Sequence, residues 1–294
     1  MITRSQTLNE RLKIPSPSHL FHYTDSTGLI GILDSEEIWA TNIRFLNDIN
    51  EVIEATEAAQ KILLELHKSS NNHKEKSLFK SMLDNINEVA SHTYVCSFSE
   101  DDDSLSQWRA YCPPSGGGYA LGIPSLQLSA QAKEQGWMFI KCIYDDVTKN
   151  QVVKEIIDSM LIDFKDGLKQ NISLKEQDEL TEKVASNFQL NLLAISGAIK
   201  NKAFKIESEW RLISPLSTDE KKIRFRKGKS GIIPYCTFKL LSNLNPKTKN
   251  LIKLVAGPTP QNDSESRQAA RYILSRYLDN STGESLSKIP YKGW

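Results

Sequence analysis

The sequence predicts an α+β fold for this chain of 294 residues. Its strand-like and helix-like segments are grouped rather than strictly alternating, which favours α+β over a doubly wound parallel sheet. Helical patterns occupy residues of about 50–90 and 150–203, and strand patterns dominate after them. We therefore expect a single domain at residues 19–294 with two helical insertions. A loose polar arm, residues 1–18, precedes it and contains Pro15 and Pro17.

The first half of the chain opens with a strand at Leu20–Tyr23, followed by a helix that runs through Leu33. Either Asp25 or Ser26 is expected to cap this helix. The next predicted elements are a strand at Glu37–Thr41, amphipathic helices at Glu51–Leu66 and Lys74–Ala90, a strand at Thr93–Ser99, a short helix opened by Ser104, and strands at Tyr119–Ile123 and Trp137–Tyr144.

The second half begins with helices and ends mainly in strands. Helices are predicted at Val152–Phe164 and Leu180–Ala203, the second long enough to span the domain. The elements expected after them are strands at Glu209–Ser214, Lys222–Arg226, Ile232–Phe238 and Leu251–Ala256, a helix at Ser264–Leu278 and a final strand at Ser285–Tyr291.

Charge is balanced overall, with 37 basic and 36 acidic residues, which argues against a bulk nucleic-acid binder. It is not balanced locally, because residues 200–253 hold 14 Lys and Arg against 4 Asp and Glu. This basic segment is either a solvated hairpin or an electropositive surface for phosphate-bearing partners. Its densest part consists of Lys221, Lys222, Arg224, Arg226, Lys227 and Lys229.

The four cysteines are scattered and form neither a zinc signature nor a disulfide framework. Cys96, Cys142 and Cys236 lie in strand-like apolar runs and are predicted to be buried thiols. No signal peptide opens the sequence and no apolar stretch approaches membrane length. We expect a protein of the reducing cytoplasm that does not contact a membrane.

Two glutamates one residue apart are the most informative local feature. Glu207 and Glu209 lead into Trp210 and Arg211, and the alternation of a strand would place both glutamates and Arg211 on one face. Two adjacent carboxylates repel each other, so either Arg211 and nearby lysines neutralise them or they face a ligand. A Glu-x-Glu strand is also what a glycosyl-transfer site that stabilises a cation would need.

A histidine ends the first predicted strand, in the run Phe21-His22-Tyr23-Thr24. Such a histidine is either structural or a hydrogen-bonding group for a sugar, with Tyr23 offering a stacking face. Further along, Ser97 and Ser99 share one strand face, which suggests solvent, a sheet edge or a polar ligand.

Trp108 and Tyr111 lie three residues apart on a predicted helix, where they either flank a groove or cap the core.

The sequence motifs of several other kinds of active site are absent. The sequence holds no P-loop, no Gly-x-Gly-x-x-Gly after a strand and no Gly-x-Ser-x-Gly. His67 and His73 lack partners at metal-ligand spacing, so no metal is expected.

Taken together and in this order, the motifs resemble a bacterial domain family of formerly unknown function that is often found in defence loci. The corresponding segments run from about residue 20 to the C-terminus: Phe21–Thr24, Leu46-Asn47-Asp48 with Glu51, Ser97–Ser99 with Trp108 and Tyr111, Glu207–Leu212, and Gly257-Pro258. That family in turn resembles the ADP-ribosyltransferase superfamily, whose signature is a first-strand His or Arg, a middle-strand Ser or Tyr and a late-strand catalytic Glu.

The resemblance implies a split β-sandwich core with helical insertions and NAD as co-substrate, without a metal. It places His22 on the adenosine-side ribose and Glu209 on the 2′-hydroxyl of the other ribose, where its charge stabilises an oxocarbenium-like transition state. Glu207 would orient or deprotonate the acceptor. Arg211 is expected to pair with an acid elsewhere, such as Asp48 or Glu51.

The middle position of the signature has four candidates, namely Ser97, Ser99, Tyr111 and Tyr119. Ser97 would brace Glu209 or the nicotinamide ribose, and Tyr23 or Tyr119 would stack on nicotinamide. The expected NAD-binding set consists of His22, Tyr23, Thr24, Ser97, Ser99, Trp108, Tyr111 and Tyr119.

The function implied is a mono-ADP-ribosyltransferase that acts as a toxin or phage-defence effector, with a neutralising antitoxin protein as partner. The basic segment after the glutamates makes a nucleic acid, RNA above all, the expected acceptor. The alternatives are a protein-directed transferase and an NAD glycohydrolase. A different class is a non-catalytic nucleotide-sensing or interaction module, in which Arg211 and Lys205 occupy Glu207 and Glu209.

Overall fold

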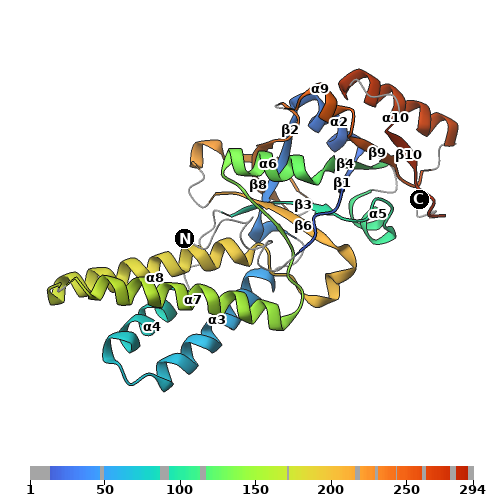
Figure 1. The fold of residues 1–294 in the computed structure, drawn as a ribbon. Helices are drawn as coiled ribbons and strands as arrows, with labels where there is room; N and C mark the ends of the chain where they lie inside the picture. Colours follow the sequence, from blue (N-terminus) through green and yellow to red (C-terminus); the bar gives the residue numbers. More distant parts are fainter. Residues whose placement is uncertain are drawn as a thin grey trace.

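Ten strands form one sheet in the computed structural model of the chain (Figure 1). The structure describes residues 14–46, 50–86, 93–112, 117–170, 172–215, 219–228, 231–242, 244–259, 263–278 and 283–290, without the side chains of 50–52 and 263. The sheet is antiparallel except for the pair formed by the last two strands. The predicted α+β class is confirmed.

The main path of the sheet runs β10-β9-β4-β1-β3-β2-β8-β7, and β6 pairs with both β3 and β5 beside this path. The strands are β1 (His19–Asp25), β2 (Glu37–Asn42), β3 (Tyr94–Ser99), β4 (Gly118–Pro124), β5 (Met138–Lys141), β6 (Glu209–Ile213), β7 (Arg224–Lys227), β8 (Ile232–Lys239), β9 (Lys253–Ala256) and β10 (Glu284–Leu286).

The sheet forks at β3. One edge of β3 pairs with β6 from Val95 to Ser99. The other edge pairs with β1 at Ser99 and with β2 at Tyr94 and Val95. Between these two pairings the described strands leave the edge of residues 96–98 without a ladder partner, so β1 and β2 diverge there.

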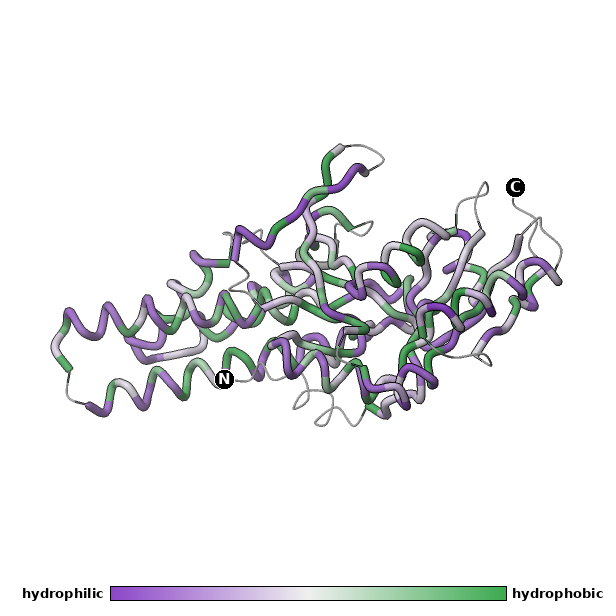
Figure 2. Tube along the Cα trace, turned by 90° about the horizontal axis from the view of Figure 1, so that it is seen from above, coloured by the Kyte–Doolittle hydropathy of each residue, from purple (hydrophilic) through white to green (hydrophobic). Residues whose placement is uncertain are grey.

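Helices cover the sheet and extend away from it. Those near the sheet are α2 (Ser26–Ser35), α5 (Leu105–Tyr111), α6 (Ser125–Gln135), α9 (Pro246–Lys249) and α10 (Asp263–Leu278). Four others form a projecting arm (Figure 1): α3 (Asn50–Ser69), α4 (His73–Ile86), α7 (Asp146–Leu168) and α8 (Leu174–Ser196). Along the arm, hydrophilic and hydrophobic residues alternate, as expected for helices that bury one stripe (Figure 2).

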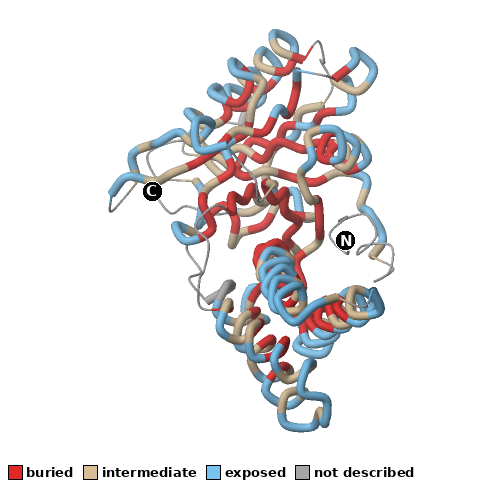
Figure 3. The backbone as a smooth tube through the Cα atoms, turned by 90° about the vertical axis from the view of Figure 1, so that its left-hand side faces the viewer, coloured by how far each residue is buried: buried red, intermediate tan, exposed pale blue. Residues whose placement is uncertain are grey.

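Two hydrophobic clusters hold these parts together, and the buried chain concentrates in the sheet and along the inside of the arm (Figure 3). The arm packs against Val95, Ile140 and Ile213 on one face of the sheet. The opposite face, which includes Cys96 and Leu212, packs against α2, α6 and α10. Alternate residues of β3 and β6 therefore enter different cores.

Most predicted elements lie within a few residues of the observed ones, and Asp25 is the residue that caps α2. Some predictions were wrong. The helix expected to end at Ala203 ends at Ser196, and the strand expected at Trp137–Tyr144 covers only Met138–Lys141. Two helices, α6 and α9, were not predicted; α6 has few apolar residues, and those it buries, Leu128 and Ala132, are accompanied by the buried polar residues Ser125 and Gln131.

Glu207 is not on a strand, contrary to the prediction from alternation. It ends a 3₁₀ helix, η2 (Lys202–Glu207), and Ser208 adopts a left-handed conformation with φ of 43°. The Ser208 amide donates to the Lys205 carbonyl and closes this turn. The strand starts only at Glu209, so the two glutamates reach their surroundings from different elements. The other short 3₁₀ helices are η1 (Ile43–Phe45) and η3 (Glu220–Lys222).

The late Gly-Pro segment has a packing role. The Gly257 amide donates to the Gly118 carbonyl, and a Cβ atom at Gly257 would lie 2.8 Å from the ring of the buried Trp108. A glycine at this position lets Trp108 pack against the backbone that follows β9.

Cys96, Cys142 and Cys236 are buried thiols outside any disulfide, as predicted. None of the helices in the described ranges is long and apolar enough to cross a membrane.

Candidate functional site

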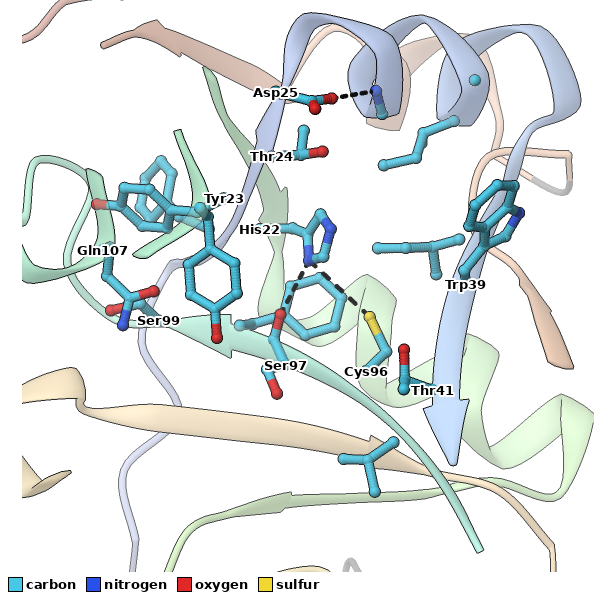
Figure 4. Close-up of a pocket in the computed structure, with 18 of the residues that line it drawn as sticks. His22, Tyr23, Thr24, Asp25, Trp39, Thr41, Cys96, Ser97, Ser99 and Gln107 are labelled. Atoms are coloured by element: carbon cyan, nitrogen blue, oxygen red, sulfur yellow. Dashed lines mark hydrogen bonds between the residues drawn. The ribbon is translucent and has the colours of Figure 1, made fainter. Parts of the chain in front are cut away.

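A cavity of about 630 Å³ lies in the fork between β1 and β2. Its lining comes from β1, the first turns of α2, β2 and the unpaired edge of β3, with further residues from α5, η2, β6 and β7. In Figure 4, Trp39 and Thr41 on β2 lie across the cavity from Tyr23 and Gln107, with His22 between them. A volume of this size is typical of small-molecule sites.

The cavity brings together residues that are distant in the sequence. The predicted site residues that line it are His22, Tyr23, Thr24, Ser97, Ser99, Tyr111, Glu207, Glu209, Arg226 and Lys227. Trp108, Tyr119, Lys221, Lys222 and Arg224 are not among its lining residues, and Lys229 lies outside the described residues. Asp48 also lies outside them, and so does the side chain of Glu51.

The side chain of His22 connects β1 to the unpaired edge of β3. Its Nδ1 is 3.0 Å from the Ser97 carbonyl oxygen, and since a carbonyl can only accept, Nδ1 carries the proton. Burial lowers the pKa of His22 below its ordinary value, which favours the neutral ring. In that form Nε2 has a free lone pair. His22 can therefore accept a hydrogen bond from a hydroxyl of a ligand in the cavity.

The two β3 serines have different roles. The Ser99 hydroxyl is buried; it donates to the Glu207 carbonyl and accepts from the Asp101 amide. It thus fixes the turn that presents Glu207. Ser97 lines the cavity, and within the described part of the chain its hydroxyl makes no hydrogen bond. Of the two, Ser97 is the one whose hydroxyl is available to a ligand.

Tyr23 and Trp108 form a buried aromatic pair with ring centroids 4.6 Å apart. The Tyr23 hydroxyl donates to the Asp101 carbonyl and accepts from the Ser104 amide, while Trp108 Nε1 donates to Asp103. These contacts leave little of either ring for stacking on a ligand, contrary to expectation. Tyr119 packs at the border of the core beneath α2, α6 and α10, away from the cavity lining.

Thr24 and Asp25 lie where β1 turns into α2. The Asp25 carboxylate accepts from the Gly28 amide at 2.7 Å and so caps the helix. Thr24 Oγ1 lies so close to Gly28 that any Cβ there would collide with it. The glycine therefore allows the threonine hydroxyl to sit beside the first turn of α2, at the rim of the cavity.

Glu209 is buried in a cluster of charges. Arg211 Nε donates to its Oε1 at 2.7 Å and Arg211 Nη2 to its Oε2 at 3.2 Å, and Lys200 Nζ also donates to Oε2. Arg211 therefore pairs with Glu209, while the partners expected for it, Asp48 and the side chain of Glu51, lie outside the described residues. Glu209 and Arg211 are two residues apart on β6, so their side chains project from the same face of the strand and can pair directly.

Lys200 is the second cation of this cluster, and its place at the site was not predicted from the sequence. Its Nζ donates to Glu207 Oε2 at 2.6 Å as well as to Glu209. The lysine that ties the two glutamates together is therefore Lys200 and not Lys205. It lies beyond the end of α8, and Arg211 Nη1 donates to the Gly197 carbonyl in the same turn. The base of the helical arm thus supplies part of the charge cluster.

Burial of Glu209 would by itself raise its pKa, but the charges and hydrogen bonds of Arg211 and Lys200 outweigh it and lower the pKa from 4.5 to about 2. Glu209 is ionised at neutral pH. A carboxylate offers about four acceptor directions. Since Arg211 and Lys200 use three of them, at most one is left for a ligand hydroxyl.

This lowered pKa predicts a loss of stability in acid. Because the folded pKa of Glu209 lies below the unfolded one, its contribution is complete above pH 4.5 and disappears as the pH falls toward 2. At 1.36 kcal/mol per unit, we expect Glu209 to cost about 2 kcal/mol of unfolding free energy between pH 6 and pH 3. Urea denaturation at both pH values should show a smaller acid loss in an Arg211→Met/Glu209→Met double variant; an equal loss would contradict the assignment.

Trp39 and Thr41 form the wall opposite, and this wall was also missed. Trp39 is 48% exposed, and its ring centroid is 4.5 Å from that of Tyr235 on β8. Arg226 Nη2 donates to Thr41 Oγ1 at 3.0 Å. The alternation of Glu37–Thr41 contained the necessary signal, because it puts Trp39 and Thr41 on the face opposite the buried Ile38 and Ala40.

The cavity combines a neutral imidazole, a free serine hydroxyl, an exposed indole, a guanidinium, the Lys227 ammonium group and the carboxylates of Asp25, Glu37, Glu207 and Glu209. Such a set suits a ligand with hydroxyl groups, an aromatic ring and negative charge. Among the described residues, no group of three or more His, Cys, Asp or Glu is arranged to hold a metal ion.

A family model described as a protein of unknown function (DUF2971) matches residues 107–212. Over this stretch the chain is similar to that family, and the stretch contains Gln107, Tyr111, Glu207 and Glu209 of the cavity together with Arg211. A search of curated proteins found no match. A search of solved structures found none either.

Proposed function

We propose that the chain is an NAD-dependent ADP-ribosyltransferase that uses this cavity. The observation that carries the proposal is the convergence of His22, Ser97 and Glu209, from the first, third and sixth strands, on one cavity. Their order along the chain is the one that the resemblance to the superfamily requires. The fork at β3 supports the same proposal, because it opens the sheet where a split β-sandwich would hold its ligand.

NAD would supply the ribosyl group and the nicotinamide leaving group. His22 Nε2 accepts from a hydroxyl of the adenosine-side ribose, and the Ser97 hydroxyl bonds to the nicotinamide ribose or to the Glu209 carboxylate. Glu209 uses its remaining acceptor direction for the 2′-hydroxyl, beside the carbon on which positive charge develops. The nicotinamide nitrogen keeps the electron pair of the bond that breaks, and the acceptor's nucleophilic atom forms the new bond to that carbon.

Glu207 takes the proton that the acceptor releases. Its side chain is 21% exposed, whereas that of Glu209 is 5% exposed, so Glu207 is the more accessible carboxylate of the two. Glu207 lines the cavity and is bonded to Lys200 through Oε2, and its other oxygen, Oε1, has no partner among the described residues. Of the pair, Glu207 is therefore the better candidate for contact with an incoming acceptor.

One observation favours a second function. The cluster of Glu207, Glu209, Lys200 and Arg211 has a formal net charge of zero, so much of the field of the carboxylates is cancelled. A pocket of this kind also suits a non-catalytic nucleotide-sensing module, which needs bound ligand but no stabilised cation. The two functions make opposite predictions about turnover.

The test is to incubate the purified protein with adenine-labelled NAD and with total RNA, total protein or neither. A transferase releases nicotinamide and moves label into one polymer, with RNA expected. Label in protein would identify a protein-directed transferase, and nicotinamide release without labelled polymer would identify a glycohydrolase. Binding of NAD by calorimetry without any nicotinamide release would overturn the transferase and support the sensing module.

The proposed role as a toxin has a separate cellular test. Expression of the wild-type chain in a bacterium should arrest growth if it modifies an essential RNA, and a neutralising partner protein should restore growth. Unchanged growth at a verified expression level would contradict the toxin role without deciding whether NAD binds.

A further inference from the structure

The outer wall of the cavity is formed by β2, β8 and β7, and it carries aromatic and basic residues to which the proposed NAD reaction gives no role. Residues directly opposite each other in an antiparallel pair point to the same face. Thr41 is opposite Tyr235, and Tyr235 is opposite Arg224. With the alternation along each strand, Trp39, Thr41, Tyr235, Arg224 and Arg226 therefore share one face.

The same register divides the predicted basic segment. Phe225 lies on the opposite face of β7, and Lys221 and Lys222 lie in η3 before it. Only part of the segment, Arg224 and Arg226, faces the side of Trp39, while Lys227 at the end of β7 also reaches the cavity. The basic residues thus do not form a single continuous patch.

Arg226 has a donor without a partner. Its Nη2 donates to Thr41, but its Nε is buried and makes no hydrogen bond within the described part of the chain. A buried donor without an acceptor is costly, so a water molecule or a ligand atom is needed to complete the bonding of Arg226. The Nε and a terminal nitrogen of an arginine form the fork that binds a phosphate with two parallel bonds.

Charge on this wall is predominantly positive. Arg224 and Arg226 share this face with one acid of β2, Glu37, whose Oε2 is 3.7 Å from Arg224 Nη1, and Lys227 adds a positive charge at the end of β7. That ion pair is weak because the Arg224 side chain is 59% exposed. An anionic ligand is therefore favoured, and the half-exposed Trp39 ring on the same face provides a flat apolar surface.

We propose that this outer wall binds a single-stranded nucleic acid, with a base stacked on Trp39 and the adjoining phosphate held by Arg226. The inference rests on the proposed function in one respect: it names the acceptor that the transferase would modify and the wall from which it reaches Glu207. Stacking on an exposed aromatic ring next to a basic strand is the common mode of single-strand recognition. A duplex keeps its base faces inside the stack and cannot use Trp39 in this way.

Fluorescence anisotropy with a labelled 20-nucleotide oligouridylate, in the absence of NAD, tests the binding step. Trp39→Ala should weaken binding by about 10-fold, within the range for one stacked base. Arg226→Met should weaken it similarly, and Arg226→Lys should restore only part of it because lysine keeps the charge but lacks the fork. Raising the salt concentration should weaken wild-type binding.

Phe225→Ala is the matched control for Trp39→Ala. Phe225 is 68% exposed on the same hairpin but points to the other face, so its loss should leave the affinity unchanged. His22→Ala, which alters the inner part of the cavity, should also leave oligonucleotide binding intact while it weakens NAD binding. Thermal melting of each variant checks that the fold is retained.

Equal binding by wild type and Trp39→Ala would overturn the proposal, as would equal binding of the oligonucleotide and a duplex of the same length. Binding of a polyglutamate peptide as tightly as the oligonucleotide would overturn it in favour of an acidic protein partner. Failure of the proposed function looks different: oligonucleotide binding would persist with the expected Trp39 and Arg226 dependence, but no nicotinamide would be released.

Discussion

Replacing Arg211 by methionine should lower the free energy of unfolding by about 3–5 kcal/mol. The substitution removes a buried guanidinium. Among the described residues Glu209 then keeps one cationic partner, Lys200, which also pairs with Glu207. Glu209 and Arg211 are 4% and 2% exposed, so water cannot replace the lost contact. An uncompensated buried charge is among the few single changes with an effect of this size. Urea denaturation at pH 7 measures it.

The matched control is Lys169→Met. Lys169 Nζ lies 2.7 Å from Asp166 Oδ1, the same separation as Arg211 Nε and Glu209 Oε1, but both side chains are exposed, at 77% and 61%. Its loss should cost only about 0–1 kcal/mol. A double Arg211→Met/Glu209→Met variant should recover part of the loss, because it removes the stranded charge. A loss below about 1 kcal/mol for Arg211→Met would show that the pair is not held as described.

The elements that the sequence predicted well are those whose signals are local. Asp25 caps α2, and the alternation of Glu37–Thr41 and Tyr94–Ser99 is that of the strands observed there. The ordered motifs also located much of the candidate site. His22, Ser97 and Glu209 line the same cavity although they come from three strands, and the resemblance supplied their order.

What the sequence did not reveal depends on contacts across the chain. The fork at β3 results from pairing with both β1 and β2, and no local pattern encodes it. Ser208 adopts a left-handed conformation that moved Glu207 off the strand, and serine carries no strong signal for that conformation. Lys200 meets both glutamates only because the chain turns back after α8. In the sequence Lys200 is one of many lysines, and nothing local indicates that it is the one that contacts the glutamates.

Replacing Glu207 by glutamine should lower the rate of ADP-ribosyl transfer to the acceptor by about 100-fold or more, the usual contribution of a positioned general base. Two effects act in the same direction. The amide cannot take the acceptor's proton, and the cluster with Lys200, Glu209 and Arg211 changes from zero to a net charge of +1. A positive cluster opposes the cation that develops on the ribosyl carbon. Glu209 still pairs with both cations, so the fold should persist.

Glu54→Gln separates catalysis from stability. Glu54 also pairs with a buried lysine, Lys149, at 2.7 Å, and its side chain is 21% exposed, the same value as for Glu207. It does not line the cavity. The two variants should therefore lose similar, small amounts of unfolding free energy, while only Glu207→Gln should lose activity. If both keep the wild-type rate, Glu207 has no part in proton transfer. If both lose it equally, the loss reflects the packing of the helical arm, in which Glu54 on α3 pairs with Lys149 on α7, and not the chemistry of the cavity.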